Sequence, residues 1–388
     1  MEKLIELYKR LLLITDSKFV RYLHDRIDWN ARLIGITGAR GTGKTTLLLQ
    51  HIKLHLDLDK TIYVNVDDVY FSENRLFDFA ETFYKHGGKH LFIDEIHKYP
   101  NWSKELKMLY DYFPDMQVVF TGSSVLDIYK GSDDLSRRAL SYHFTGLSFR
   151  EYLMMSQNIQ IPVYPLDSIL SNQVQLPVEH PLPLFKKYLQ TGFYPFYHEP
   201  GFERRLQNIL NQSLEIDIPV YAHMNIATAR KLKQLLYIIA QSVPFKPNLN
   251  KIAEMTGVHR NSVGDYFHYM EKAGLIMQLK NNTGGIRVLG KIEKIYLDNP
   301  NLIYILANDS ANTGNVRETF FCNQMSVNNI VYSSDSADFV IGDCTFEVGG
   351  KNKGQKQISG MSKAFIVKDD IEFGYQNVLP LWTFGFNY

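Results

Sequence analysis

The chain has 388 residues, of which 45% are apolar and 21% charged, so it has the composition of an ordinary globular protein and the length of two to four domains. The formal net charge of +1 excludes a chain-wide attraction to nucleic acid, and any such binding must come from a local patch. The two cysteines, Cys322 and Cys344, are far apart and lack metal-ligand spacing, which disfavours a disulfide framework and favours a cytoplasmic location.

The N-terminal stretch MEKLIELYKRLLLITDSKF places charged side chains among leucines at helical spacing. This pattern predicts an amphipathic helix that packs on the next domain, and it does not fit a signal peptide. No apolar run in the sequence approaches the ~18 residues that a membrane crossing needs. We therefore expect a protein without a membrane partner.

A strand-like run, Leu33 to Thr37, is followed by a glycine-rich loop and then by a helical pattern from Thr45. The loop satisfies the G-x-x-x-x-G-K-[ST] pattern in the strand–loop–helix context that gives the pattern its meaning. Glycines let consecutive N–H groups point at phosphate oxygens, and the helix adds the positive end of its dipole. The sequence predicts that ATP is bound by Gly38, Ala39, Arg40, Gly41, Thr42, Gly43, Lys44, Thr45 and Thr46. Lys44 would reach the β- and γ-phosphates, and the Thr45 hydroxyl would ligate Mg²⁺.

A second apolar run, Leu91 to Ile93, ends in Asp94 and Glu95. Carboxylates at the carboxyl ends of parallel strands lie beside the phosphate loop. We expect Asp94 to hold Mg²⁺ through water and Glu95 to act as the general base that activates the attacking water. A third strand in MQVVFTGSS ends in Thr121 and Ser123, whose hydroxyls suit a sensor of the γ-phosphate.

The order of the phosphate loop, FIDEIHKYPNW, VVFTGSS and DLSRRALSYHFTGLSFREYL resembles prokaryotic AAA-type P-loop ATPases of the AAA_14/DUF4143 kind, relatives of the archaeal-type ATPases. The resemblance implies an α/β fold with an AAA-type parallel-sheet domain, a helical lid, a winged helix and a restriction-endonuclease-like C-terminal domain. It also implies an arginine that contacts the γ-phosphate, as an arginine finger or sensor. Arg138 is the first candidate and Arg137 the alternative, acting in cis or from a neighbouring subunit, because a guanidinium neutralises charge that develops in phosphoryl transfer. The alternative is that both arginines only solvate a loop.

Prolines break the segment that follows residue 153, so short helices joined by turns are expected there. Two longer amphipathic patterns, beginning at Arg204 and Ala227, predict the helices of a lid over the nucleotide. Next, helix-forming residues 251–255, a turn at Thr256 to Val258 and a second helix from His259 to Lys272 have the spacing of a helix-turn-helix core. The stretch GLIMQLKNNTGGIRVLG then predicts the two strands of a wing.

The predicted winged helix has two interpretations. If its second helix enters a DNA major groove, His259, Arg260, Asn261 and Ser262 face the base edges, and Lys280 and Arg287 of the wing face phosphate. Alternatively, the segment is a packing module. Its basic content is modest, and DNA binding depends mainly on an electrostatic footprint.

From about Lys291, short strands alternate with one helix around Glu318. The resemblance aligns Glu318, Asp338 and Glu347 with the acidic residues of a restriction-endonuclease-like site, in which two strand carboxylates hold Mg²⁺ and a lysine orients water. The position two residues after Glu347 is glycine, and Lys351 is the first lysine beyond it. A nuclease with a displaced lysine, an inactive nuclease fold used for binding, and a plain surface turn all remain open. We expect that Lys351 does not join the carboxylates.

The sequence thus predicts four domains, an ATPase domain over residues 1–155, a lid over 156–242, a winged helix over 243–290 and a nuclease-like domain over 291–388. The first functional hypothesis is an ATPase that couples nucleotide state to DNA or protein binding. Its alternatives are a nucleotide-switched interaction module with little turnover and an ATP-gated, metal-dependent DNA nuclease. A trans-acting arginine would require a homo-oligomer.

Overall fold

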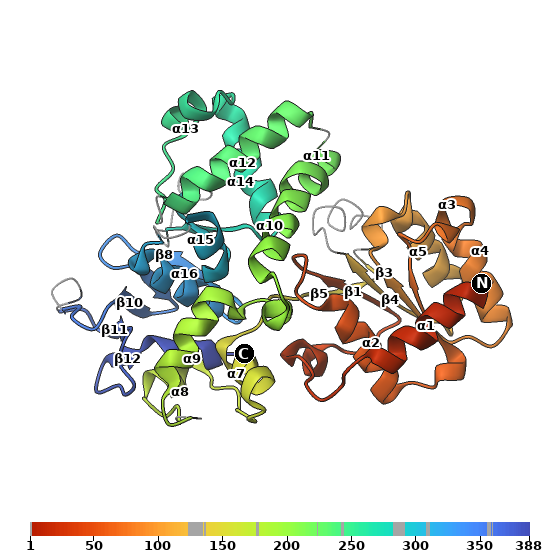
Figure 1. Cartoon of the computed structure of the whole chain (residues 1–388), viewed down its shortest axis with the longest axis horizontal. Helices are drawn as coiled ribbons and strands as arrows, with labels where there is room; N and C mark the ends of the chain where they lie inside the picture. Colours follow the sequence, from red (N-terminus) through yellow and green to blue (C-terminus); the bar gives the residue numbers. More distant parts are fainter. Residues whose placement is uncertain are drawn as a thin grey trace. The chain divides into compact units, whose positions relative to one another are not determined.

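A computed structural model describes residues 2–122, 135, 137–175, 178–222, 224–241, 244–281, 292–307, 311–354, 358 and 360–388. The chain forms two compact units, Met1–Gly146 and Leu147–Tyr388 (Figure 1). The first unit therefore ends before residue 155, the end expected for the ATPase domain. Among the described residues, no helix combines the length and the hydropathy that a bilayer crossing requires.

The first unit is built on a five-stranded parallel sheet with the strand order β2-β3-β4-β1-β5. Its strands are β1 (Leu33–Thr37), β2 (Thr61–Asn65), β3 (His90–Asp94), β4 (Gln117–Gly122) and β5 (Leu140–His143). The central strands are apolar almost without interruption because helices cover both faces of such a sheet. All five carboxyl ends meet at one edge, and β4 separates β1 from β3.

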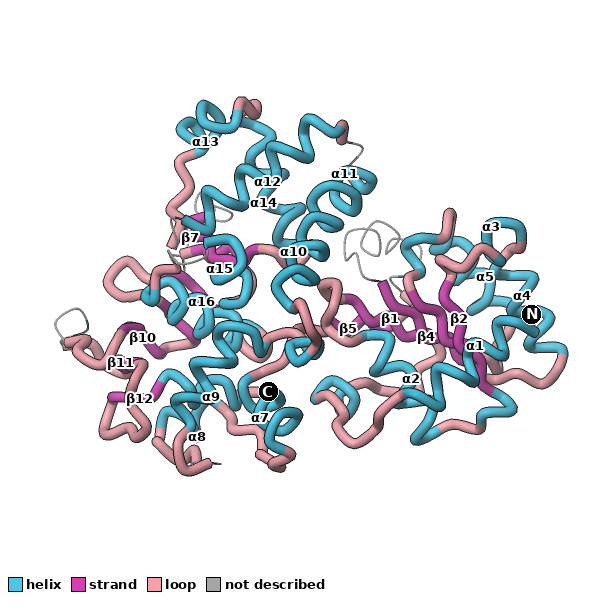
Figure 2. Tube along the Cα trace, in the orientation of Figure 1, coloured by secondary structure: helices cyan, strands magenta, loops and turns pink. Residues whose placement is uncertain are grey.

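Helices flank this sheet, as Figure 2 shows. They are α1 (Glu2–Ile14), η1 (Tyr22–Arg26), α2 (Lys44–His55), η2 (Leu58–Lys60), α3 (Tyr70–Glu73), α4 (Leu76–Lys85), η3 (Ile96–Lys98) and α5 (Trp102–Tyr112). The N-terminal helix α1 buries Leu4, Tyr8 and Leu12, which share one face at a four-residue spacing, and it packs against α2 and β2. The predicted amphipathic N-terminal helix is confirmed.

The second unit opens with short helices, as the prolines indicate. They are α7 (Phe149–Gln157), α8 (Leu166–Leu170), α9 (Pro181–Lys187), η4 (Tyr188–Gly192) and η5 (Pro195–His198). Ser148 and Glu151 form a capping box at the start of α7. The Tyr388 carbonyl accepts hydrogen bonds from Ser148 Oγ (3.0 Å) and Arg150 Nε (2.8 Å). These bonds explain why α7 belongs to the second unit although the sequence places it in the first domain.

Longer helices follow, α10 (Phe202–Gln212), η6 (Ser213–Asp217), α11 (Ile218–Tyr221), α12 (Ile226–Gln241), α13 (Leu249–Thr256) and α14 (Arg260–Lys272). Gly257 has a φ of +60° and reverses the chain between α13 and α14, where the sequence predicts the turn. Strand β6 (Ile276–Lys280) then pairs antiparallel with β7 (Ile292–Leu297). The partner of β6 is thus a strand that the sequence analysis assigns to the C-terminal domain, so this pairing crosses the boundary expected at residue 290.

The C-terminal part is a mixed five-stranded sheet with the order β12-β11-β10-β9-β8, parallel from β12 to β10 and antiparallel from β10 to β8. Its strands are β8 (Val331–Ser333), β9 (Phe339–Ile341), β10 (Cys344–Gly349), β11 (Ala364–Lys368) and β12 (Val378–Pro380), accompanied by α15 (Pro300–Ala307), α16 (Thr313–Ser326) and η9 (Leu381–Phe386). Cys322 is buried, Cys344 is half-buried, and both are free thiols. The α/β character is confirmed, whereas a winged helix and a restriction-endonuclease fold stay predictions.

Candidate nucleotide site

The glycine-rich loop connects the carboxyl end of β1 to the first turn of α2. Gly41 (φ +80°) and Gly43 (φ +96°) adopt the left-handed backbone that side-chain-bearing residues avoid. Gly43 is the N-cap of α2, and no side chain caps the helix. The first N–H groups of a helix lack intrahelical partners, so this end of α2 offers donors and the positive end of a dipole to an anion.

Lys44 lies under the loop and is buried. Its Nζ donates hydrogen bonds to the carbonyls of Gly38 and Ala39, both at 2.8 Å. Burial lowers the pKa of Lys44 to about 8, although the nearby carboxylates of Glu95 and Asp94 act in the opposite direction. The loop therefore holds a desolvated ammonium whose charge a phosphate would stabilise.

A buried arginine that the sequence analysis missed braces this loop from behind. Arg21 donates to the Thr42 carbonyl (2.9 Å) and to the carbonyls of Thr145 (3.0 Å) and Gly146 (2.8 Å). Its guanidinium lies 4.4 Å from the centroid of the Phe144 ring. Gly38 passes so close to the Phe144 carbonyl that a Cβ on this glycine would collide with it. The loop is thus fixed against the segment that follows β5.

Asp94, at the carboxyl end of β3, is 2% exposed and sits within a ring of donors. Its Oδ2 accepts hydrogen bonds from Thr45 Oγ1 (2.6 Å) and Tyr63 OH (2.7 Å). Its Oδ1 accepts from Thr121 Oγ1 and from the Glu95 N–H (3.1 Å). Because the Thr45 hydroxyl donates its proton to Asp94, its lone pairs point away from the carboxylate and are available to a cation.

The network changes the role expected for Thr121 and adds Tyr63. Thr121 is fully buried and bonded to Asp94, so the structure places this hydroxyl behind the carboxylate, where it orients Asp94. Tyr63 was not anticipated, and burial together with the nearby charge of Asp94 raises its pKa. Ser123, the other proposed sensor of the γ-phosphate, lies outside the described residues.

Glu95 follows Asp94 with a left-handed backbone (φ +56°), which turns its side chain away from the direction of the strand. Its Oε2 lies 3.4 Å from Nε2 of His97, and the two side chains are 20% and 4% exposed. The carboxylate therefore remains accessible to water while the buried imidazole limits its orientation. His97 is a further residue that the sequence analysis missed.

Arg138 lies at the opposite edge of the sheet from the phosphate loop. It precedes β5, whose first residue, Leu140, pairs with Ile34 near the amino end of β1. Its Nε donates to Asp111 Oδ1 at the end of α5 (3.1 Å), and its guanidinium lies 5.8 Å from the centroid of the Tyr110 ring. This placement disagrees with a role for Arg138 in the nucleotide site of its own subunit, because the length of the strands separates it from the phosphate loop at their carboxyl ends.

The acidic residues of the predicted nuclease-like site lie near one another in the second unit. Glu318 of α16 accepts a hydrogen bond from Tyr296 OH (2.7 Å), and burial together with the charge of Asp338 raises its pKa to about 7. Asp338 lies 3.9 Å from Nζ of Lys294, as measured to its Oδ1. Glu347 of β10 is 1% exposed.

The lysine that reaches Glu347 is Lys353, which forms an ion pair with its Oε1. The Lys353 side chain crosses Gly349, where an added Cβ would lie 2.7 Å from Cδ of the lysine. Lys351 is exposed, and its backbone carbonyl accepts from Lys368 Nζ (3.1 Å). Lys351 thus stays apart from the carboxylates, and the sequence analysis did not assign Lys353 to this site.

Four of the residues proposed to contact DNA are exposed, namely His259, Arg260, Asn261 and Lys280, whereas Ser262 is half-buried. His259 is the N-cap of α14, and its Nδ1 accepts from the Asn261 N–H (3.4 Å). Arg260 begins the helix, and Lys280 ends β6. Arg287 lies outside the described residues.

Comparison with known families identifies two segments of the chain. Residues 30–153 match a family described as an AAA domain (AAA_14), and residues 182–313 match a domain of unknown function, DUF8612. The first match agrees with the phosphate loop and with Asp94, and it supports nucleotide binding and hydrolysis by an AAA-type P-loop domain. The second match is to a different family from the expected DUF4143 kind, and so that part of the resemblance is not confirmed.

Two uncharacterized proteins of Methanocaldococcus jannaschii are similar to the chain. One is 26% identical over 268 residues, which cover 64% of this chain and 56% of that protein, and the other is 26% identical over 261 residues, which cover 63% and 56%. The chain thus spans little more than half the length of these relatives.

Two solved structures show weaker likeness. A Walker-type ATPase of Pyrococcus abyssi matches with a TM-score of 0.46 and 11% identity over 74% of this chain and 96% of that one. The protein PCH-2 of C. elegans matches with a TM-score of 0.26 and 16% identity over 68% of each chain. Both scores are too low to establish a shared fold over the whole length.

Proposed function

We propose that the chain is a Mg²⁺-dependent ATPase whose first unit binds and hydrolyses ATP at Gly38 to Thr46, Asp94 and Glu95. The observation that carries this proposal is the hydrogen bond from Thr45 to Asp94, because it joins the phosphate loop to the carboxylate that P-loop enzymes need beside it. Neither residue needs to move to present the Thr45 lone pairs to a cation.

The donor set suits Mg²⁺ and a triphosphate. Mg²⁺ prefers oxygen ligands and usually keeps several waters, which matches one hydroxyl from Thr45 and a carboxylate from Asp94 that acts through water. When bound, Mg²⁺ neutralises negative charge on the β- and γ-phosphates. Lys44 and the N–H groups of α2 would hold the phosphate oxygens themselves.

Glu95 is the residue we assign to proton abstraction from the attacking water. Its carboxylate directly follows Asp94, remains partly exposed and is restrained by His97. A positioned general base contributes typically about 10²–10⁴-fold to a rate. In this scheme His97 is a positioning residue and Thr121 holds Asp94 in place.

Two substitutions test the proposal. We expect Lys44→Ala to abolish ATP binding measured by calorimetry, and Glu95→Gln to retain ATP binding while turnover falls by about 10²-fold or more. Matched controls are Lys85→Ala and Glu81→Gln, which remove the same groups from an exposed ion pair on α4. Unchanged turnover in Glu95→Gln would show that Glu95 is not the base.

We further propose that nucleotide state is coupled to DNA or protein binding by the second unit. The support is the exposed first turn of α14, where His259, Arg260 and Asn261 lie together. ATP turnover measured with and without duplex DNA distinguishes a DNA partner from a protein partner. Stimulation by DNA that is lost in Arg260→Ala favours DNA, and turnover that DNA does not change favours a protein. Arg205→Ala, which changes an exposed arginine on α10 of the same unit, is the matched control. A protein that binds ATP with negligible turnover would instead be a nucleotide-controlled switch.

For the acidic cluster of the second unit we propose a role in fold stability. Lys353 pairs with Glu347, and Lys294 Nζ lies 3.9 Å from Asp338 Oδ1, so two cations of the chain already offset negative charge at this site. We expect supercoiled DNA incubated with Mg²⁺ or Mn²⁺ to remain intact. Nicking that disappears in both Asp338→Ala and Glu347→Ala would contradict this role and establish a nuclease.

A further inference from the structure

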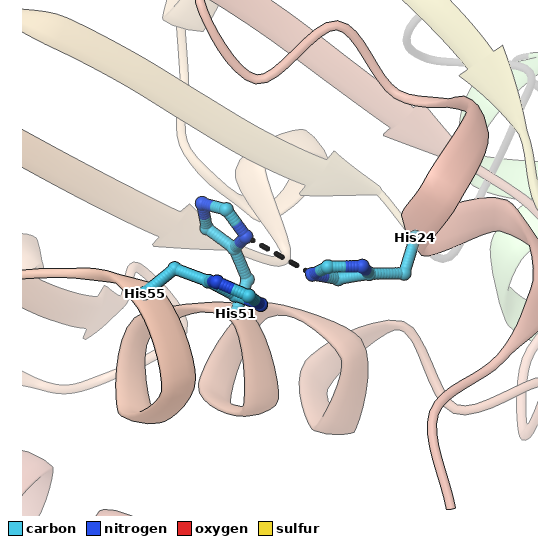
Figure 3. A group of neighbouring side chains, drawn as sticks. All are labelled: His24, His51 and His55. Atoms are coloured by element: carbon cyan, nitrogen blue, oxygen red, sulfur yellow. Dashed lines mark hydrogen bonds between the residues drawn. The ribbon is translucent and has the colours of Figure 1, made fainter.

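Three histidines converge at the far end of the helix that begins at the phosphate loop. His51 and His55 lie on the last turns of α2, and His24 comes from η1. Each ring offers one nitrogen, and these three nitrogens all lie within 4.8 Å of one another. Figure 3 shows the three side chains converging. His51 is ~10 Å along the helix from Lys44 at 1.5 Å per residue, so the cluster is separate from the nucleotide site.

The geometry of the cluster suits a metal ion. His51 and His55 are four residues apart and therefore project from one face of α2, a spacing that places two imidazoles on a single zinc ion. His24 Nε2 lies 3.2 Å from His51 Nδ1. Two nitrogens bound at ~2.0–2.1 Å to one tetrahedral ion lie about 3.3 Å apart, which is nearly the observed separation.

The protonation of the rings also fits. His24 Nδ1 lies 3.2 Å from the carboxylate of Asp25, a contact that favours the tautomer with its proton on Nδ1 and its Nε2 lone pair towards His51. A metal-binding histidine is commonly oriented by a carboxylate in this way. Burial and the neighbouring histidines lower the pKa of His51 to about 3, so its ring is neutral at physiological pH.

Trp29 restrains His51 and His24, and His55 remains accessible to solvent. The His51 ring stacks on Trp29 with a centroid distance of 3.6 Å and an interplanar angle of 9°. Trp29 Nε1 donates to the His24 carbonyl (2.8 Å), which fixes the backbone of η1 against the same indole. His55 is exposed, so it offers an entry path and the freedom to adjust.

We propose that His24, His51 and His55 bind one divalent transition metal ion of the zinc class, with water as the remaining ligand. Such an ion ties η1 to the end of α2. Residue Arg21 directly precedes η1 and holds the Thr42 carbonyl of the phosphate loop, so the ion also strengthens the support of the loop. The alternative is a metal-free cluster in which His51 Nδ1–H donates to His24 Nε2.

Titration of the full chain, free of any histidine tag, with Co²⁺ tests the proposal. We expect one equivalent to produce the visible absorption of tetrahedral cobalt, Zn²⁺ to displace it, and one equivalent of Zn²⁺ to remain after dialysis. We expect His55→Ala to weaken binding by at least 100-fold, and it should fold normally because His55 is exposed. The matched control is His86→Ala, an exposed histidine at the end of α4 that is expected to keep full binding.

Tryptophan fluorescence supplies an independent reading, because Co²⁺ next to the stacked indole quenches Trp29. This quenching should be absent in Trp29→Phe while the cobalt absorption remains. The proposal is overturned if the wild-type chain shows no saturable cobalt band, or if His55→Ala binds Co²⁺ as tightly as His86→Ala. These readings do not use ATP turnover, so they stand apart from the proposed ATPase activity.

Discussion

Raising the pH should weaken ATP binding through one group, the buried amine of Lys44. Its pKa is lowered to about 8 because the loop desolvates it and offers only carbonyl oxygens as partners. Phosphate oxygens stabilise the ammonium and thus return the pKa in the complex towards the ordinary 10.5. Nucleotide binding is therefore expected to take up protons above neutral pH.

The size of the effect follows from these two values. With a pKa of about 8 in the free protein, the charged fraction of Lys44 falls from about three-quarters at pH 7.5 to about one-tenth at pH 9. With the amine of the complex still charged at pH 9, the apparent Kd should rise roughly eightfold, equivalent to ~1.2 kcal/mol. At pH 8, about half a proton is taken up for each nucleotide bound.

Calorimetric titration with a slowly hydrolysed ATP analogue measures both quantities. Proton uptake is obtained by comparing two buffers of different ionisation enthalpy, above pH 7.5 so that the terminal phosphate does not titrate. Lys44→Arg is the control, because a guanidinium stays charged over this range and its affinity should not change with pH. An unchanged Kd between pH 7.5 and 9 in the wild-type protein, or an equal rise in Lys44→Arg, would refute the reasoning.

The remaining predictions concern stability and the distant arginine. Tyr63→Phe removes a hydrogen bond to the Asp94 carboxylate and should lower the free energy of unfolding by about 1.5–3 kcal/mol, measured by denaturant titration; a loss below half a kcal/mol would contradict it. Arg138→Ala should leave the Kd for ATP within about twofold of the wild-type value, because loss of a charge-assisted contact with phosphate would raise it about tenfold or more. A tenfold rise would show that Arg138 contacts the nucleotide bound to its own subunit. Lys353→Met should cost about 1–3 kcal/mol because it leaves a buried carboxylate unpaired, whereas Lys351→Met should cost nothing measurable, and equal effects would disprove the assignment.

Local patterns in the sequence sufficed for the first half of the site. The loop from Gly38 to Thr45 was predicted with its strand and helix because the motif depends on neighbouring residues only. Asp94 was placed correctly beside it because carboxyl ends of parallel strands share an edge. Both predictions rest on rules that need no knowledge of strand order.

The residues that were missed depend on contacts distant in the sequence. Tyr63 reaches Asp94 because β2 pairs with β3. Arg21 reaches the loop because it also donates to the carbonyls of Thr145 and Gly146, which follow β5. Single tyrosines and arginines give no local signal of such bonds. The placement of Arg138 likewise required the parallel register of β1 and β5, which puts the start of β5 far from the loop.

In the second unit, the sequence analysis expected Lys351 to stay away from the carboxylates but did not identify the lysine that joins them. The chain turns after Gly349, and the Lys353 N–H donates to the Gly350 carbonyl (2.9 Å). The turn returns Lys353 over the strand and leaves Lys351 exposed.

The contacts of Arg21 connect the nucleotide site to the end of the first unit. One planar guanidinium holds Thr42 of the phosphate loop and also Gly146, the last residue of the first unit. The peptide that follows leads straight into α7. Displacement of Thr42 by an incoming phosphate would therefore disturb a buried charge-assisted hydrogen bond of Arg21. The same side chain holds Thr145 and Gly146, so the conformation of the phosphate loop is linked to that of the segment that ends the first unit.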